Sequence, residues 1–399
     1  MLFERWGYIL ALTGIIAEFN PLHNGHKLLI DRAKTGGDTV AAVISGNFVQ
    51  RGECAATEKA LRTKFALLCG VDIVAELPTL WSMSTAGNFA LGGVWQLYTL
   101  GCSKIIFGSE CGDIEKLTAT ADILCSDKFF SHLTENVNGA LTFAAAREAA
   151  AEELGADVSV LNNPNDNLGV EYIIAAKKLN LPIEFCCVKR EGAGHDSKCI
   201  SGDFVSASYI REELSGGNIA FAERFMPSVL HGVIKEKDIA DGKRLQTAIL
   251  SVLRTKTAKD FENLPDMSEG LNNRLEFAVR SSSTFDELLA QLKSKRYTLA
   301  RVRRLVLSAF LGFDNSFFMK TPPYTRLLGA SEKGLEFLSK GIMYDIVTKP
   351  SQIKALGSDA KKVFDSECRA TDIFTLALQT PVEPGLEYKR KFLKSEDLL

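Results

Sequence analysis

The sequence of 399 residues lacks the features that mark several special classes of protein. No apolar run reaches the roughly 20 residues that a membrane-spanning helix needs. Eleven prolines, 31 glycines and 24% charged residues exclude collagen-like, low-complexity and wholly disordered chains. The nine cysteines form no C-x-x-C pair, which argues against a zinc ribbon or a redox motif. We expect free thiols in the reducing cytoplasm and no membrane partner.

Net charge is also nearly absent, at −2, and by itself gives no sign of a nucleic acid partner. The total hides an asymmetry between the two halves of the chain. Residues 1–215 hold 18 Lys and Arg against 26 Asp and Glu, whereas residues 216–399 hold 29 against 23. An acidic half of charge −8 therefore precedes a basic half of charge +6, and the basic half can bind a polyanion.

Short β-branched runs alternate with helical patterns in the first half of the chain. Expected strands cover 12–19, 39–44, 73–77, 104–107 and 183–188. The expected helices include 57–69 with Thr57 as N-cap, 86–100, a helical region over 114–154, and a helix capped by Asn165 or Asp166 that ends at Lys178. This alternation predicts an α/β fold with a parallel sheet and helices on both faces. Ligands of such sheets bind at the carboxyl ends of the strands.

Strand signals fade after about residue 218, and helical periods dominate the rest. We therefore expect two domains, an α/β catalytic domain over 1–218 and a mainly helical, basic domain over 219–399.

The loop directly after the first expected strand carries the strongest chemical signal. In it, His23 and His26 flank Gly25 at the start of a helix, whose free N–H groups and partial positive charge favour a phosphate. Gly25 permits close approach of a phosphate to the backbone. The imidazoles can donate hydrogen bonds to α-phosphate oxygens in the transition state. Two surface histidines are the alternative, which the position after a first parallel strand disfavours.

This strand, loop and helix with His-x-Gly-His resembles the nucleotidyltransferase-like α/β superfamily. The segment Val205–Arg211 resembles the element with which adenylyltransferases close over the β- and γ-phosphates. Ser206 or Ser208 would cap a helix there, and Arg211 would add positive charge. Serine caps are common, so this segment supports a phosphate site only in combination with the histidine loop.

Several further segments follow the expected strands and resemble the bacterial tRNA(Met) cytidine acetate ligase family in order and spacing. They cover the whole expected catalytic domain and reach into the helical one: 45–53, 76–78, 107–110, 163–172, 189–195, 295–304 and 324–329. The chain begins about ten residues before the expected first strand of the family, with Met1–Leu10.

The resemblance implies an activity. Enzymes of this family use ATP to activate acetate as acetyl-adenylate, then transfer the acetyl group to N4 of the wobble cytidine of elongator tRNA(Met), which forms N4-acetylcytidine. It implies catalytic roles for His23 and His26. It implies ATP contacts, together with the phosphate element above, at Ile16, Ala17, Glu18, Phe19, Asn20, Pro21, Leu22, His23, Asn24, Gly25, His26, Lys27, Leu28, Leu29, Gly108, Asn165, Arg190, Ser206, Ser208 and Arg211. For the asparagine, Asn162, Asn163 and Asn167 are close alternatives.

Acetate is already ionised at pH 7, so its attack on the α-phosphate needs charge neutralisation and no base. His23, His26, Arg190 and Mg²⁺ are candidates for that neutralisation; Mg²⁺ is expected with ATP, although no carboxylate cluster in the sequence marks its ligands. The 46–47 loop and the 84–89 segment are candidate walls of an acetate pocket.

Other polar residues near these motifs allow more than one role. Arg51 either contacts phosphate or RNA or is a solvated loop residue, and Glu18 either orients a histidine or caps the loop. His195 is either a nucleotide or RNA contact or an ordinary loop residue.

A basic segment in the second half is the candidate tRNA contact. Tyr297 lies among its cations and can stack on a base, while Arg301 and Arg304 share a helix face. A basic helix face is often only solvated, and it is the resemblance that favours tRNA here. The implied contacts are Lys295, Arg296, Arg301, Arg303 and Arg304, with a second cluster at 389–392.

Two other functions fit parts of the pattern. A small-molecule adenylyltransferase of the same superfamily would use the histidine and serine motifs equally, but would leave the basic domain without a role. A non-catalytic RNA-binding protein on the same fold is disfavoured by the intact His23, Gly25 and His26.

Overall fold

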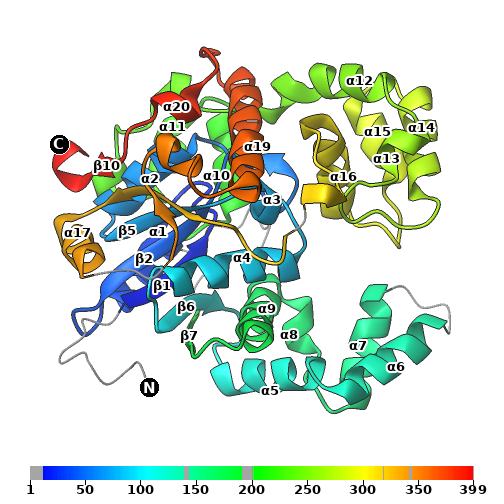
Figure 1. Cartoon of the computed structure of the whole chain (residues 1–399), viewed down its shortest axis with the longest axis horizontal. Helices are drawn as coiled ribbons and strands as arrows, with labels where there is room; N and C mark the ends of the chain where they lie inside the picture. The colour runs from blue at the N-terminus through cyan, green and yellow to red at the C-terminus, as the bar shows by residue number, and fades with distance from the viewer. Residues whose placement is uncertain are drawn as a thin grey trace.

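A mostly parallel, eight-stranded sheet lies at the centre of the computed structural model, which describes residues 12–138, 143–190, 200, 202–317, 319–340 and 344–398 (Figure 1). The strand order is β10-β8-β5-β2-β1-β6-β7, and β9 pairs with β8. The strands are β1 (Leu12–Ala17), β2 (Thr39–Ser45), β5 (Ile73–Leu77), β6 (Lys104–Ser109), β7 (Glu184–Lys189), β8 (Thr325–Ala330), β9 (Ile346–Val347) and β10 (Leu393–Lys394). A separate hairpin consists of β3 (Phe48–Val49) and β4 (Glu53–Cys54).

The five strands predicted from the first half of the chain all occur and all pair in parallel. Their side chains alternate between two cores, as a period of two requires. Ile15 and Ile44 pack on one face of the sheet, while Ile16 and Val43 pack on the other. The predicted mostly parallel α/β sheet is thereby confirmed.

The sheet continues into the second half of the chain, where the strand signals fade. β8 lies antiparallel beside β5, with Val74 opposite Gly329, and β9 and β10 pair with β8. All six residues of β8 are buried, so its sequence lacks the alternation that marks a half-exposed strand. The sheet therefore contains both halves of the chain, and the boundary at 218/219 stays a prediction.

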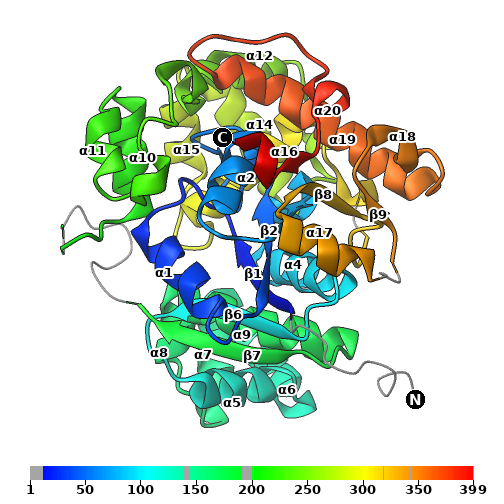
Figure 2. The same cartoon turned by 90° about the vertical axis from the view of Figure 1, so that its left-hand side faces the viewer.

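Helices cover both faces of the sheet (Figure 2). One core includes residues of α1 (Asn24–Ala33), α2 (Lys59–Leu68) and α10 (Ala207–Ser215); the other includes residues of α4 (Ala86–Thr99), α5 (Ile114–Leu124) and α9 (Pro164–Leu179). The shorter or peripheral helices are α3 (Thr79–Ser82), α6 (Asp127–Asn138), α7 (Phe143–Glu153), α8 (Ser159–Asn162), α11 (Ile219–Glu223), α17 (Glu332–Ser339), α18 (Pro350–Ile353) and α20 (Leu386–Lys389). Among the described helices, none has the length and apolar character to cross a membrane.

Two predicted helix caps were wrong. α2 begins at Lys59 after Glu58, and the Thr57 hydroxyl makes no hydrogen bond within the described residues. α9 begins at Pro164, which is favoured at the first helical position, and its N-cap is Asn163. The fully buried Asp166 instead accepts hydrogen bonds from the N–H groups of the turn after β6.

A group of helices lies beside the sheet, at the right in Figure 1, and α19 (Ser358–Phe374) stands between the two. The group consists of α12 (Gln246–Arg254), α13 (Ala258–Phe261), α14 (Leu271–Ser281), α15 (Phe285–Leu292) and α16 (Leu299–Leu311). α16 packs so closely on the β3–β4 hairpin that a Cβ on Gly52 would lie 2.6 Å from the Arg304 backbone nitrogen.

A buried ionic cluster fastens the C-terminal segment to the sheet. Lys59 of α2 contacts Glu76 of β5 and lies 2.7 Å from Glu387 of α20. Arg326 of β8 contacts the same two carboxylates. Burial raises the pKa of the neighbouring Glu367 to about 8, with Glu76 adding to the rise, so this carboxyl holds its proton at pH 7. Lys59 and Arg326 thus face two carboxylates and one neutral acid in the interior, and Arg390 also pairs with Glu387.

Candidate active site

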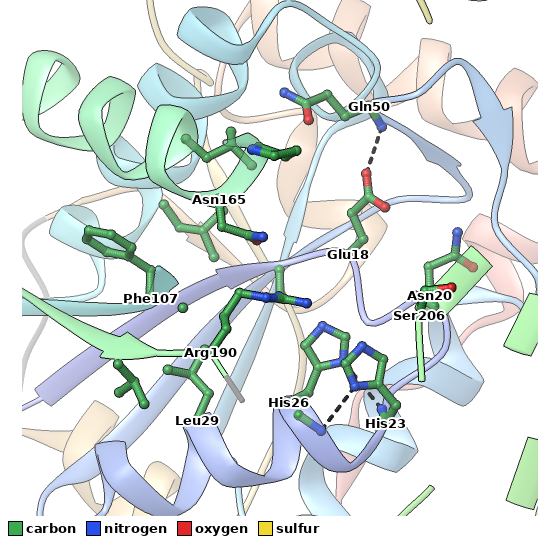
Figure 3. Close-up of a pocket in the computed structure, with 18 of the residues that line it drawn as sticks. Glu18, Asn20, His23, His26, Leu29, Gln50, Phe107, Asn165, Arg190 and Ser206 are labelled. Atoms are coloured by element: carbon green, nitrogen blue, oxygen red, sulfur yellow. Dashed lines mark hydrogen bonds between the residues drawn. The ribbon is translucent and has the colours of Figure 1, made fainter. Parts of the chain in front are cut away.

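A pocket with a volume of about 380 Å³ opens at the carboxyl ends of the parallel strands (Figure 3). Its lining comes from the end of β1, the start of α1, the hairpin tip, α4, β6, α9, β7 and α10. This is the edge at which parallel α/β sheets bind ligands.

The turn between β1 and α1 fixes the two histidines as a pair. Phe19 has a φ of 46°, which turns the chain out of β1, and His23 is the N-cap of α1. The Gly25 N–H donates to His23 Nδ1 at 3.1 Å, and the His23 N–H donates to His26 Nδ1 at 3.3 Å. Because each Nδ1 accepts, the proton of each neutral ring resides on Nε2. The rings stack with centroids 3.8 Å apart.

Both imidazoles are neutral at pH 7. Burial lowers the pKa of His23 to about 3, and Arg190 and Arg211 reinforce the shift. Burial, His23 and Arg190 likewise hold the pKa of His26 well below its usual value. The histidines therefore offer Nε2–H donors without positive charge. The expectation that they help to neutralise charge stays a prediction; in the pocket without ATP, Arg190 and Arg211 are the positively charged lining residues near them.

The α10 segment lies directly against the histidine loop. Of the two candidate serines, Ser206 is the N-cap, and its hydroxyl accepts from the Tyr209 N–H at 3.3 Å. Ser208 lies at the same helix start, with its hydroxyl 3.4 Å from that of Ser206. Arg211 donates to the Asn20 carbonyl at 2.9 Å. Two motifs that are far apart in sequence thus share one hydrogen bond and one pocket.

The opposite wall comes from β6, β7 and α9. Gly108 lies beside Arg190, because a Cβ on Gly108 would be 3.5 Å from Arg190 Cγ. Asn165 lines the pocket and donates to the Glu110 carboxylate. Asn167 also lines it, whereas Asn162 and Asn163 do not.

Glu18 connects the pocket to the β3–β4 hairpin. Its carboxylate accepts from the Gln50 N–H at 3.0 Å, so it holds the hairpin tip and no hydrogen bond to a histidine is found among the described residues. Burial raises the pKa of Glu18, while Arg211 opposes the rise. Gln50 and Arg51 at that tip line the pocket.

Most of the residues predicted to contact ATP lie around this one pocket. Those that line it are Ile16, Ala17, Glu18, Asn20, His23, Gly25, His26, Leu28, Leu29, Gly108, Asn165, Arg190, Ser206, Ser208 and Arg211. Five do not: Phe19 and Leu22 are fully buried in the core, and Pro21, Asn24 and Lys27 are not part of the lining. A contiguous stretch on a turn and a helix cannot direct every side chain to one side.

Tyr172, Phe204 and Val205 also line the pocket, although none of them was among the predicted ATP contacts. Tyr172 and Val205 belong to segments that the resemblance named, whereas only the fold brings Phe204 to the pocket. Phe89, at the end of the proposed acetate wall, does line it, together with Ala86. The loop that contains His195 lies outside the described residues.

The structure divides the predicted tRNA contacts into two sets. Lys295 and Arg296 are exposed. Arg301 instead donates to the Asp266 carbonyl at 2.7 Å, Arg304 pairs with the Asp266 carboxylate at 2.9 Å, and Arg303 pairs with Glu53. Arg304 also donates to the Gln50 carbonyl at 3.3 Å, so α16 is hydrogen-bonded to the hairpin tip.

The expectation that Tyr297 stacks on a base was wrong. Its ring is only 6% exposed. The guanidinium groups of Arg301, Arg296 and Arg274 surround it at 5.2, 5.6 and 5.8 Å from the centroid. These cation–π contacts occupy the faces that a base would need.

No cluster of three or more His, Cys, Asp or Glu residues able to hold a metal ion occurs in the part of the chain that the structure describes. Among the described residues, the pocket lining includes one carboxylate, Glu18, with its pKa raised. These residues do not form a dedicated magnesium site, which would need several oxygen ligands.

The family model described as HIGH Nucleotidyl Transferase matches residues 10–387. A tRNA(Met) cytidine acetate ligase from Caldanaerobacter subterraneus subsp. tengcongensis is 37% identical over 96% of this chain and 99% of its own length. One from Clostridium kluyveri is 37% identical over 83% of this chain and 87% of its own length.

Two crystal structures of TmcAL from Thermotoga maritima share the whole fold. The form bound with alpha-thio ATP has a TM-score of 0.88 and 30% identity, and the apo form has a TM-score of 0.90 and 31% identity. Each covers 96% of this chain and 100% of the solved chain.

Proposed function

The chain belongs to the tRNA(Met) cytidine acetate ligase family, and from this premise we propose that it is an ATP-dependent ligase that acetylates N4 of the wobble cytidine of elongator tRNA(Met). The observation that supports this most strongly is the shared pocket of the two phosphate motifs, joined by the bond from Arg211 to Asn20.

In the first step, a carboxylate oxygen of acetate attacks the α-phosphorus of ATP, and pyrophosphate leaves. The Nε2–H groups of His23 and His26 donate to the α-phosphate oxygens as charge builds on them. Arg190 and Arg211 supply the positive charge that the neutral histidines lack. The start of α10, with Ser206 and Ser208, receives the departing phosphates, since a helix N-terminus favours anions.

In the second step, the cytidine N4 attacks the acetyl carbon, AMP leaves and N4 loses a proton. N4 is a weak nucleophile because its lone pair is delocalised into the ring, so the reactive mixed anhydride supplies the driving force. The cytosine must leave its stack to reach the pocket. Gln50 and Arg51 at the hairpin tip line the pocket, and Gln50 also contacts Arg304 of α16. On this proposal the base enters past that tip.

The remaining roles extend this proposal. The pocket residues named above contact ATP, with Gly108, Asn165 and Arg190 on the wall opposite α10. Mg²⁺ is expected to arrive on the ATP phosphates, and no protein ligand is assigned to it. Lys295 and Arg296 contact tRNA directly, while Arg301, Arg303 and Arg304 contribute by fixing α16 and the hairpin tip. We place the enzyme in the cytoplasm, with its tRNA and ATP.

Acetate-dependent exchange between ATP and labelled pyrophosphate, without tRNA, tests the first step. Mass spectrometry of nucleosides from tRNA incubated with the protein, ATP and labelled acetate tests the second. Equal exchange with and without acetate would contradict the proposal, and transfer of AMP to a phosphorylated metabolite would favour an adenylyltransferase instead.

A further inference from the structure

A second depression lies far along the chain from the motifs of the active site. This C-terminal groove, with a volume of about 770 Å³, is lined by Thr348–Ser351, Lys354, Tyr388–Phe392 and Lys394. Its walls are the β9–α18 region and the segment from α20 to β10, which gather beside α19 (Figure 2). Residues about 40 positions apart thus form one surface.

The groove is strongly basic. Among its lining residues there is no Asp or Glu, and six of them are cations: Lys349, Lys354, Lys389, Arg390, Lys391 and Lys394. The sequence revealed only the cluster at 389–392, because Lys349 and Lys354 are brought to it by the fold.

Three of these cations have no counterion among the residues that the structure describes. Lys389 lies 3.4 Å from Glu383, and Lys394 lies 3.0 Å from Glu396. Lys349, Lys354 and Lys391 are exposed and form no ion pair with any described residue. Close spacing of unpaired cations costs repulsion in the free protein, which a polyanion in the groove would relieve.

One wall of the groove is firmly anchored. The Arg390 side chain is only 10% exposed and pairs with Glu58 and Glu387, and Glu387 belongs to the buried ionic cluster. Arg390 thus lines the groove but is held by these two carboxylates, whereas its neighbours Lys389 and Lys391 are exposed. The cations are consequently held on a preformed surface, which reduces the ordering cost of binding.

An aromatic ring completes the groove. Tyr388 is 62% exposed. Its ring makes an edge-to-face contact with the ring of Phe364, with centroids 5.4 Å apart and an interplanar angle of 88°, which fixes its orientation. An exposed ring among phosphate-binding cations can stack on an unpaired base, which a phosphopeptide or a lipid surface would not use.

We propose that the C-terminal groove binds the sugar-phosphate backbone of the tRNA, outside the nucleotide that is acetylated. The proposal rests on the proposed function for the identity of the RNA. It gives the tRNA a docking surface on which Lys349, Lys354 and Lys391 form no ion pair with a described residue, whereas the arginines of α16 are mostly engaged within the protein.

The test compares two triple variants of the full chain. The groove variant is Lys349→Gln, Lys354→Gln and Lys391→Gln; the control variant removes three exposed lysines elsewhere, Lys128→Gln, Lys178→Gln and Lys237→Gln. Filter binding measures the Kd for elongator tRNA(Met) over a range of salt concentrations. Each lost phosphate contact lowers the slope of log K against log salt by about 0.7–0.9, so three contacts weaken binding roughly 100-fold at about 0.1 M salt.

The groove variant should show this loss with a slope lower by about 2–2.7, while the control variant changes little. Acetate-dependent pyrophosphate exchange, measured without tRNA, should equal wild type in both. Equal tRNA affinity and slope in the groove and control variants would overturn the groove assignment, even where exchange shows the enzyme to be active. So would a groove variant that loses only binding to vesicles of anionic lipid. Absence of acetate-dependent exchange in the wild type would instead refute the proposed function, and the tRNA titration would still decide the groove.

Discussion

Replacing Lys59 by methionine should destabilise the protein far more than the loss of one surface charge. Lys59 is fully buried and contacts Glu76 and Glu387, with Glu367 at 3.9 Å. Methionine keeps most of the side-chain volume but leaves Glu76 and Glu387 with Arg326, while Arg390, which Glu58 shares, contacts only Glu387 of the two. The variant thus carries one uncompensated negative charge in the interior.

The expected loss is about 3–5 kcal/mol, the range for breaking a buried ion pair from one side. The double variant Lys59→Met with Glu387→Gln restores the charge balance and should recover about 1–3 kcal/mol of this loss. In the single variant a carboxyl must bind a proton to relieve the excess charge. Its native-state pKa then exceeds that of the unfolded chain, so stability falls as pH rises and the deficit is smaller at pH 5 than at pH 8.

Urea denaturation at pH 5 and pH 8, followed by tryptophan fluorescence and by circular dichroism, measures these differences. The surface variant Lys361→Met, which removes only an exposed pair with Asp365, serves as the control and should change stability by less than about 1 kcal/mol. A loss in Lys59→Met no larger than in this control, or one that is the same at both pH values, would show that the buried charges do not act as described.

Three further predictions concern the site and its supports. His26→Ala should lower acetate-dependent exchange by about 10²–10³-fold through loss of one oxyanion donor, with the Kd for tRNA unchanged in filter binding; parallel loss of both would refute separate roles. Glu367→Gln should flatten the stability of the protein between pH 5 and pH 8 in urea titrations. Its native pKa of about 8 lies above the unfolded value, so the wild type loses stability as pH rises through this window, and an unchanged profile in the variant would contradict a protonated Glu367. Arg304→Gln should release Gln50 and lower the rate of acetyl transfer to tRNA, with rescue by Arg304→Lys; a lower slope of tRNA affinity against salt, with normal transfer at saturation, would identify Arg304 as a direct RNA contact.

Local signals in the sequence predicted the parallel strands and also predicted that the histidine loop and the Ser206 segment start helices. Each of the five strands is a short apolar run between turns, and the histidine loop carries its own capping pattern, in which His23 and His26 bond to the backbone of the same turn. Information of this kind is contained within a few neighbouring residues.

What the sequence did not predict depends on contacts between distant segments. β8 forms by pairing with β5, which lies far earlier in the chain. Thr325–Ala330 lacks the alternation of buried and exposed residues that marks a half-exposed strand in a sequence. The neutral state of the histidines follows from burial beside Arg190 and Arg211, which lie far along the chain. The guanidinium groups around Tyr297 cover its ring. In the sequence, the same arginines suggested that the ring binds RNA.

The position of β8 in the sheet has a consequence for how the protein is made. β5 emerges from the ribosome early, but its partner strand is translated roughly 250 residues later, which at about 5–20 residues per second is on the order of 10–50 s. During that interval β5 presents an unpaired edge and Glu76 lacks the guanidinium of Arg326. An exposed edge of this kind invites pairing with other chains. Nascent chains that stop before β8 should therefore depend on chaperones. The sheet that carries the catalytic pocket is complete only after the C-terminal strands have been translated and have paired.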